Sequence, residues 1–173
     1  MSVREKIMRR RTCCIDANIL FDFVAGEIFD QLFLLPFDFH TSDIVANEIS
    51  GSYSERQLTQ RGLEILALDD SEVIEIFTLK QEHIDLSVED VSVYFLSRKH
   101  GTMILSNDGP LRELADASRI EYHGTLWLLE EMIQGEILQP QEAASALRFM
   151  LKNKRWLPRP ECEALIKKWE SEE

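Results

Sequence analysis

Short apolar segments of strand length alternate along this chain with longer segments whose apolar residues recur at helical spacing. Parallel strands need crossover connections, which are usually helical, so this alternation favours a sheet covered on both faces. We therefore expect an α/β fold of three layers, α/β/α, with a central, mostly parallel sheet and a C-terminal helical extension. The expected strands cover residues 12–16, 37–42, 63–70, 102–106 and 120–124.

Capping residues set the expected helix bounds. Ser87 is placed to cap a helix that ends at Gly101, and Ser71 is placed to open the helix before it. Gly26 predicts a break after the first helix, and Gly51 marks the end of the helix that contains Glu48. Three further helices, punctuated by Gly135, Pro140 and Pro158, are expected near the C-terminus.

The length of 173 residues and the hydrophobic content of 45% suit one compact domain. We expect it to comprise a flexible basic lead-in (1–11), a core (12–135) and C-terminal helices packed on that core (136–173). No segment approaches the roughly 18 apolar residues of a membrane span, and the N-terminus lacks the apolar core of a signal peptide. Cys13, Cys14 and Cys162 are too few for a disulfide framework, which favours a reducing compartment. These features predict a soluble, cytoplasmic protein without a membrane partner.

The net charge of -12 argues against broad electrostatic capture of nucleic acid, because non-specific affinity comes largely from Lys and Arg. It argues less against a metal-dependent nuclease, whose clustered carboxylates attract cations that then meet the phosphate.

Four acidic residues are placed to converge at one edge of the sheet. Asp16 closes the first expected strand and Asp108 follows the strand at 102–106, while Glu48 and Asp90 lie on helices that can border the same edge. Crowded carboxylates repel one another unless they are protonated or bind a cation, and oxygen ligands of this kind suit Mg²⁺ or Mn²⁺. Such a site can activate water against a phosphodiester. The alternatives are that Asp16 only caps a helix, that Asp90 and Asp108 complement helix dipoles, and that Glu48 is solvated.

The ordered segments "CIDANIL", "DIVANEIS", "LSVEDVSVYFLSRKHGTMILSNDGPLRELA" and "IEYHGTLWLLEEMIQGEI" resemble the successive signatures of PIN-domain nucleases. The resemblance spans about residues 12–157. It implies a PIN-like fold in which Asp16, Glu48, Asp90 and Asp108 are the catalytic and metal-binding acids. It also implies supporting roles for Asn18, Ser106 and Asn107 in orienting ligands or water. Many family members carry a further acid where this chain has Asn107.

The C-terminal segment is most similar to a prokaryotic branch that includes suspected toxin-antitoxin ribonucleases. The resemblance thus implies a metal-dependent endoribonuclease that acts on RNA, with an antitoxin protein as a possible partner. The rival interpretation is a non-catalytic PIN module that binds a partner or serves as a scaffold. An aspartyl-phosphate phosphatase would need a second Asp at the position of Asn18, and a dinucleotide-binding enzyme would need a glycine-rich turn after the first strand.

Other residues have two readings each. The basic run of Arg9, Arg10 and Arg11 could contact RNA or be a solvated segment, and Arg112 and Lys99 could contact phosphate or form surface ion pairs. For the three tryptophans, core packing or a subunit contact is favoured over base stacking. The stripe of Leu126, Leu129 and Ile133 could support a homodimer or hold an antitoxin segment.

Overall fold

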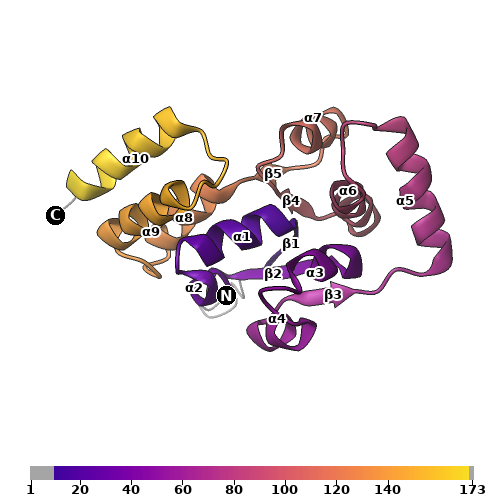
Figure 1. Ribbon diagram of the computed structural model, residues 1–173, viewed down its shortest axis with the longest axis horizontal. Helices are drawn as coiled ribbons and strands as arrows, with labels where there is room; N and C mark the ends of the chain where they lie inside the picture. The colour runs from indigo at the N-terminus through magenta and orange to yellow at the C-terminus, as the bar shows by residue number, and fades with distance from the viewer. Residues whose placement is uncertain (1–9, 172–173) are drawn as a thin grey trace, which may run out of the picture.

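A single parallel sheet organises the computed structural model, which describes residues 10–171 (Figure 1). The strand order is β3-β2-β1-β4-β5. The strands are β1 (Arg11–Ile15), β2 (Phe37–Ser42), β3 (Glu64–Leu66), β4 (Met103–Leu105) and β5 (Tyr122–His123). The predicted α/β fold with a parallel sheet is confirmed. Most of the basic lead-in expected over residues 1–11 falls outside the described residues, and β1 begins at Arg11.

Helices connect and follow the strands, as the alternation in the sequence predicted. They are α1 (Ala17–Ala25), α2 (Phe29–Leu32), α3 (Asp43–Ile49), α4 (Glu55–Arg61), α5 (Asp70–Glu82), α6 (Val88–His100), α7 (Gly109–Ala117), α8 (Thr125–Gln134), α9 (Pro140–Lys152) and α10 (Arg159–Ser171). None of these helices, in the part of the chain that the structure describes, is both long and apolar enough to cross a membrane.

The sheet separates two hydrophobic cores, because successive side chains of a strand point to opposite faces. Cys13 and Ile15 of β1 lie in the core formed with α1, α2, α3, α4, α8, α9 and α10, whereas Cys14 lies in the core formed mainly with α5, α6 and α7. Trp169 of α10 is fully buried in the first core. The predicted three-layer α/β/α arrangement is therefore confirmed, and Figure 1 shows α1 and α6 on different sides of the sheet.

The strand order reverses at β1, which lies between β2 and β4. From β1 the chain proceeds through β2 to β3 at one edge, and α5 and α6 then return it to β4 on the other side of β1. Ile15 pairs with Leu105 in the parallel register, so the residues that follow these two strands emerge side by side. In open α/β sheets, ligands bind beyond the carboxyl ends of the strands at such a reversal.

Local capping explains where the helices around this edge begin and end. Ser87 caps α6 in a reciprocal capping box, and Gly101 ends the helix with a φ of 64°, as predicted. The expected serine cap at Ser71 is wrong. Asp69 caps α5 instead, because its carboxylate accepts the Glu72 N–H at 2.9 Å, while the Ser71 hydroxyl donates to that same carboxylate.

Candidate functional site

Asp16 lies at the carboxyl end of β1 and is only 2% exposed. Its Oδ1 accepts the Ile19 N–H at 2.9 Å and so caps α1, and its Oδ2 accepts the hydroxyl of Ser106. The pKa of Asp16 is raised to about 7, mainly by burial and to a smaller extent by the nearby Asp90 and Asp22 carboxyls, while the two hydrogen bonds oppose the rise. The cap is real, but burial and neighbouring charge make this carboxyl more than an ordinary cap.

Asp108 lies beyond the adjacent strand β4, beside Asp16. Its Oδ2 accepts the Leu111 N–H at 2.9 Å and caps α7, with Pro110 in the first turn as expected. Ser106 links the two acids: its hydroxyl donates to Asp16 and accepts the backbone N–H of Asp108 at 3.0 Å. Ser106 is fully buried, so it holds the Asp16 carboxylate in one orientation.

Asp90 is the electrostatic centre of the acidic group. It occupies the third position of α6, where its Oδ2 accepts the N–H and the hydroxyl of Ser87 at 3.0 and 2.8 Å. Partial burial raises its pKa, as do the charges of Asp108 and Glu89. Asp90 in turn raises the pKa of Asp16. The carboxyls that follow β1 and β4 are thus coupled through α6.

Glu48, near the end of α3, lies at the exposed side of the same group. Its pKa is raised by partial burial and then by the charges of Glu89 and Asp90. Glu89, next to Asp90 on α6, is half-buried, and its charge raises the pKa of both Glu48 and Asp90. The structure therefore brings the four predicted acids, with Glu89, into one electrostatic neighbourhood, which we call the acidic centre.

The acidic centre has the donor chemistry of a divalent-cation site. Within residues 10–171, none of its four predicted acids forms an ion pair with Lys, Arg or His. The hydrogen bonds of Asp90 and Asp108 go to Oδ2, which leaves Oδ1 free of described partners. Hard oxygen donors with unbalanced negative charge fit Mg²⁺ or Mn²⁺.

The acids are not drawn tightly together. Among the described residues, no three His, Cys, Asp or Glu side chains are already gathered as a ligand cluster. The capping bonds account for this, because they hold Asp16, Asp90 and Asp108 each toward its own helix.

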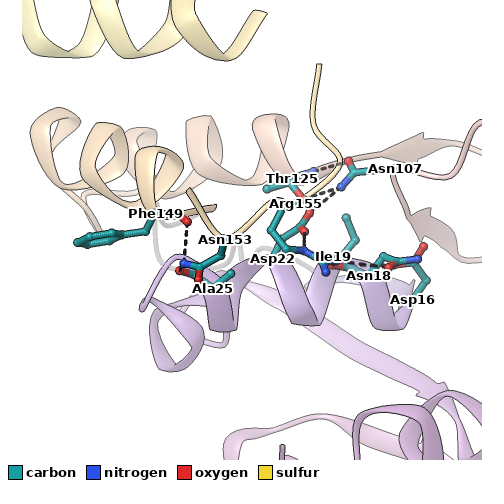
Figure 2. A network of polar contacts seen from close by, with 10 residues as sticks. All are labelled: Asp16, Asn18, Ile19, Asp22, Ala25, Asn107, Thr125, Phe149, Asn153 and Arg155. Atoms are coloured by element: carbon teal, nitrogen blue, oxygen red, sulfur yellow. Dashed lines mark hydrogen bonds and ion pairs between the residues drawn. The ribbon is translucent and has the colours of Figure 1, made fainter. Parts of the chain in front are cut away.

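A second polar group, centred on Asp22, was not predicted from the sequence. Asp22 of α1 is 2% exposed; its Oδ2 accepts the Thr125 hydroxyl at 2.7 Å and the Asn107 amide at 2.9 Å (Figure 2). Its Oδ1 accepts Nε of Arg155 at 2.5 Å. Burial raises the pKa of Asp22, and these three partners oppose that rise. The carboxyl thereby ties α1 to the loop after β4, to α8 and to the segment after α9.

The predicted supporting residues divide between the two groups. Ser106 contacts Asp16, whereas Asn107 bonds to Asp22 and Thr125, and Asn18 accepts Arg155 through its backbone and side-chain oxygens at 3.2 and 3.3 Å. A sequence signal for Asp22 did exist. It is the lone carboxyl on the helical face that also carries the buried Ile19 and Phe23, and a buried charge requires partners.

The basic and aromatic residues can now be placed. Arg10 pairs with Asp38 and Arg11 with Glu121 at the start of β1, at the opposite end of that strand from Asp16, and Arg9 lies outside the described residues. Lys99 forms an ion pair with Glu72. Arg112 lies over the Tyr122 ring, 4.9 Å from its centroid, without an ion pair among residues 10–171.

Of the two roles expected for the tryptophans, core packing is wrong for one of them, and a subunit contact stays a prediction. Trp169 is buried and Trp127 is stacked between Phe37 and His123, but Trp156 is 94% exposed. The stripe on α8 faces inward: Leu129 is fully buried, and Leu126 and Ile133 pack against the same core. The stripe thus contributes to this core, and its expected role in holding a second subunit or an antitoxin stays a prediction.

Comparison with known proteins identifies the family of this chain. A family model described as a PIN domain matches residues 12–171. The crystal structure of PAE2754 from Pyrobaculum aerophilum is similar, with a TM-score of 0.48 and 13% identity over 70% of this chain and 95% of that chain. No curated protein matches the sequence. Since the family model covers nearly the whole chain, the protein belongs to the PIN domain family.

Proposed function

We propose that this protein is a metal-dependent endoribonuclease, with Asp16, Glu48, Asp90 and Asp108 as the acids that hold Mg²⁺ or Mn²⁺. The PIN domain is a nuclease-type fold, which supports phosphodiester cleavage as the reaction class. The observation that carries the proposal is the coupling of these carboxyls at the reversal between β1 and β4, without a basic partner among the described residues. Repulsion of this kind is relieved by a cation.

The chain's own residues have distinct tasks in this proposal. Ser106 fixes Asp16 through Oδ2 and is itself fixed by the backbone of Asp108. The capping box engages Oδ2 of Asp90, so Oδ1 is the oxygen that would bind the metal ion. A bound divalent ion would supply a more acidic water and would neutralise charge that builds on the phosphate oxygens.

The proposal extends to biology. We infer that the protein is the toxin of a toxin-antitoxin pair and acts on RNA in the cytoplasm, which rests on the resemblance of its C-terminal segment to that branch of the family. Induced expression of the wild type in bacterial cells should then arrest growth, while Asp16→Asn should not. Continued growth with soluble wild-type protein would contradict the toxin role and leave the nuclease proposal untouched.

The direct experiment is cleavage of mixed single-stranded RNAs in Mn²⁺, Mg²⁺ or chelator. Wild type, Asp16→Asn and Asp90→Asn are compared with Asp116→Asn, which removes an exposed carboxyl farther along the helix that Asp108 caps. We expect cutting by the wild type and by Asp116→Asn only with metal, and loss of cutting in the other two. Activity that survives Asp16→Asn would point to a contaminating nuclease.

A non-catalytic, partner-binding module is the second candidate. The net charge of -12 and the engagement of three acids in helix caps favour it. Absence of cleavage with every metal, together with absence of metal binding, would select this candidate and make a pull-down the next step.

A further inference from the structure

Trp156 is an indole held almost entirely in solvent. It lies between α9 and α10 and is 94% exposed, although burying an aromatic side chain of this size is favourable. Its backbone is nevertheless fixed. The preceding residue, Arg155, is bonded to Asp22 and Asn18, and the Leu157 N–H donates to the Arg155 carbonyl at 3.1 Å. The indole is thus displayed on a braced segment.

Two cavities meet at this side chain. The first, of about 270 Å³, is bounded by Asn18, Asn107, Asp108 and Trp156 among others. The second, of about 180 Å³, is bounded by Asn107 and Trp156 among others. Both lie below the range of about 300–1,000 Å³ that is typical for pockets of drug-sized ligands, so each suits a small group. Because Asp108 belongs to the acidic centre, a ligand in the first cavity lies beside that centre.

The second cavity adds aromatic and cationic character. His123 and Trp127 line it and are stacked on each other, with ring centroids 3.8 Å apart. Arg112 also lines it, and within residues 10–171 this guanidinium has no acidic partner. An arginine without an acidic partner, placed beside aromatic rings, is the combination that holds the phosphate and the base of a single strand.

We propose that Trp156 is a stacking platform for an unpaired nucleobase of the RNA that reaches the acidic centre, with Arg112 as a phosphate contact. This inference rests on the proposed function and narrows its substrate to single-stranded RNA. Bases inside a duplex are already stacked and paired, so a lone displayed indole cannot reach their faces. A stacking platform would also contribute RNA affinity that does not come from positive charge, which suits a protein with a net charge of -12.

The test separates RNA binding from RNA cleavage. Binding of a fluorescently labelled single-stranded RNA is measured by anisotropy in chelator, where cleavage is absent, for wild type, Trp156→Ala and Trp156→Phe. Leu34→Ala is the matched control. Leu34 is 67% exposed and precedes β2, so it lies at the amino ends of the strands, whereas the acidic centre lies at their carboxyl ends. A duplex of the same sequence serves as the second ligand.

We expect Trp156→Ala to weaken single-strand binding about tenfold or more, Trp156→Phe to retain most of it, and Leu34→Ala to match the wild type. The duplex should bind weakly to all four proteins. In Mn²⁺, cleavage by Trp156→Ala should show a raised KM with kcat little changed.

The failures are distinguishable. If Trp156→Ala binds and cleaves RNA as well as the wild type does, the platform is refuted and the nuclease proposal stands. Trp156-dependent binding without cleavage in any metal would support the platform and refute the proposed function. A fall in molecular mass of Trp156→Ala by light scattering, with unchanged RNA binding, would show that a second copy of the chain covers the indole and would also refute the platform.

Discussion

Replacing Asp16 with asparagine should stabilise the metal-free protein, by an amount that grows with pH. The pKa of Asp16 is about 7 in the folded protein, against 3.8 for a free side chain. This difference of about 3 pH units, at about 1.4 kcal/mol for each, amounts to a penalty of about 4 kcal/mol once the pH exceeds 7. Below about pH 4 the carboxyl is protonated in both folded and unfolded chains, so the penalty is absent there.

The sign follows from the proton balance. Between about pH 4 and 7 the unfolded chain has lost this proton while the folded chain keeps it, so the stability of the wild type falls as the pH rises. An asparagine has no proton to lose. It can still cap α1 with its amide oxygen, because Asn is among the preferred N-cap residues, and its amide can donate to the Ser106 hydroxyl.

The assay is urea unfolding in chelator, monitored by circular dichroism at pH 5, 6, 7 and 8. It compares the wild type, Asp16→Asn and the exposed control Asp116→Asn. We expect the advantage of Asp16→Asn to increase steadily toward pH 8, while Asp116→Asn follows the wild type. Mn²⁺ at about 100 times its Kd should then stabilise the wild type by about 2.7 kcal/mol and leave Asp16→Asn unchanged. An advantage that is constant with pH would refute the assigned burial and charge crowding.

Three further predictions concern the polar groups and the reaction. Gly124→Ala would bring its methyl carbon into a clash with the amide oxygen of Asn107 and should lower the urea midpoint. Gly51→Ala, at a position that faces open space, should not lower it, and equal midpoints for the two variants would contradict the contact. Arg155→Met should cost about 3 kcal/mol in the same assay by leaving the buried Asp22 without its ion pair, and a loss below about 1 kcal/mol would show that the hydrogen bonds alone suffice. At Mn²⁺ concentrations below saturation, the rate of RNA cleavage should fall as the pH decreases below about 7, because a proton competes with the metal for the buried carboxyl at the end of β1. A profile that is flat from pH 5 to 8 under these conditions would remove that carboxyl from the metal site.

The features that could be predicted from the sequence are those set by near neighbours in the chain. Ser87 and Gly101 bound α6 because a cap and a left-handed glycine act within a few residues. The same holds for Asp108 and Pro110 at the start of α7. The three-layer fold could be predicted for a similar reason. Segments with strand-like and helix-like spacing of apolar residues alternate along the chain, and each segment carries its own apolar face. The position of the acids followed from the strand ends, but their catalytic role stays a prediction.

The features that could not be predicted depend on contacts between distant segments. Asp22 and Arg155 are 133 residues apart, and no local pattern indicates that the segment after α9 returns to α1. The exposure of Trp156 has the same origin, because the Arg155 anchor turns the next residue outward. The half-burial of Glu89 depends on how α6 meets α3, which neither helix encodes alone.

The central claim is that the acids at the β1–β4 reversal form one divalent-cation site, and calorimetric titration with Mn²⁺ at pH 8 tests it most directly. Asp90 is the residue to remove, since its charge is coupled to Asp16, Glu48 and Asp108. The account predicts that the wild type and Asp116→Asn bind Mn²⁺ equally and that Asp90→Asn binds at least about tenfold more weakly. Equal binding by Asp90→Asn, or the absence of binding by the wild type, would contradict it.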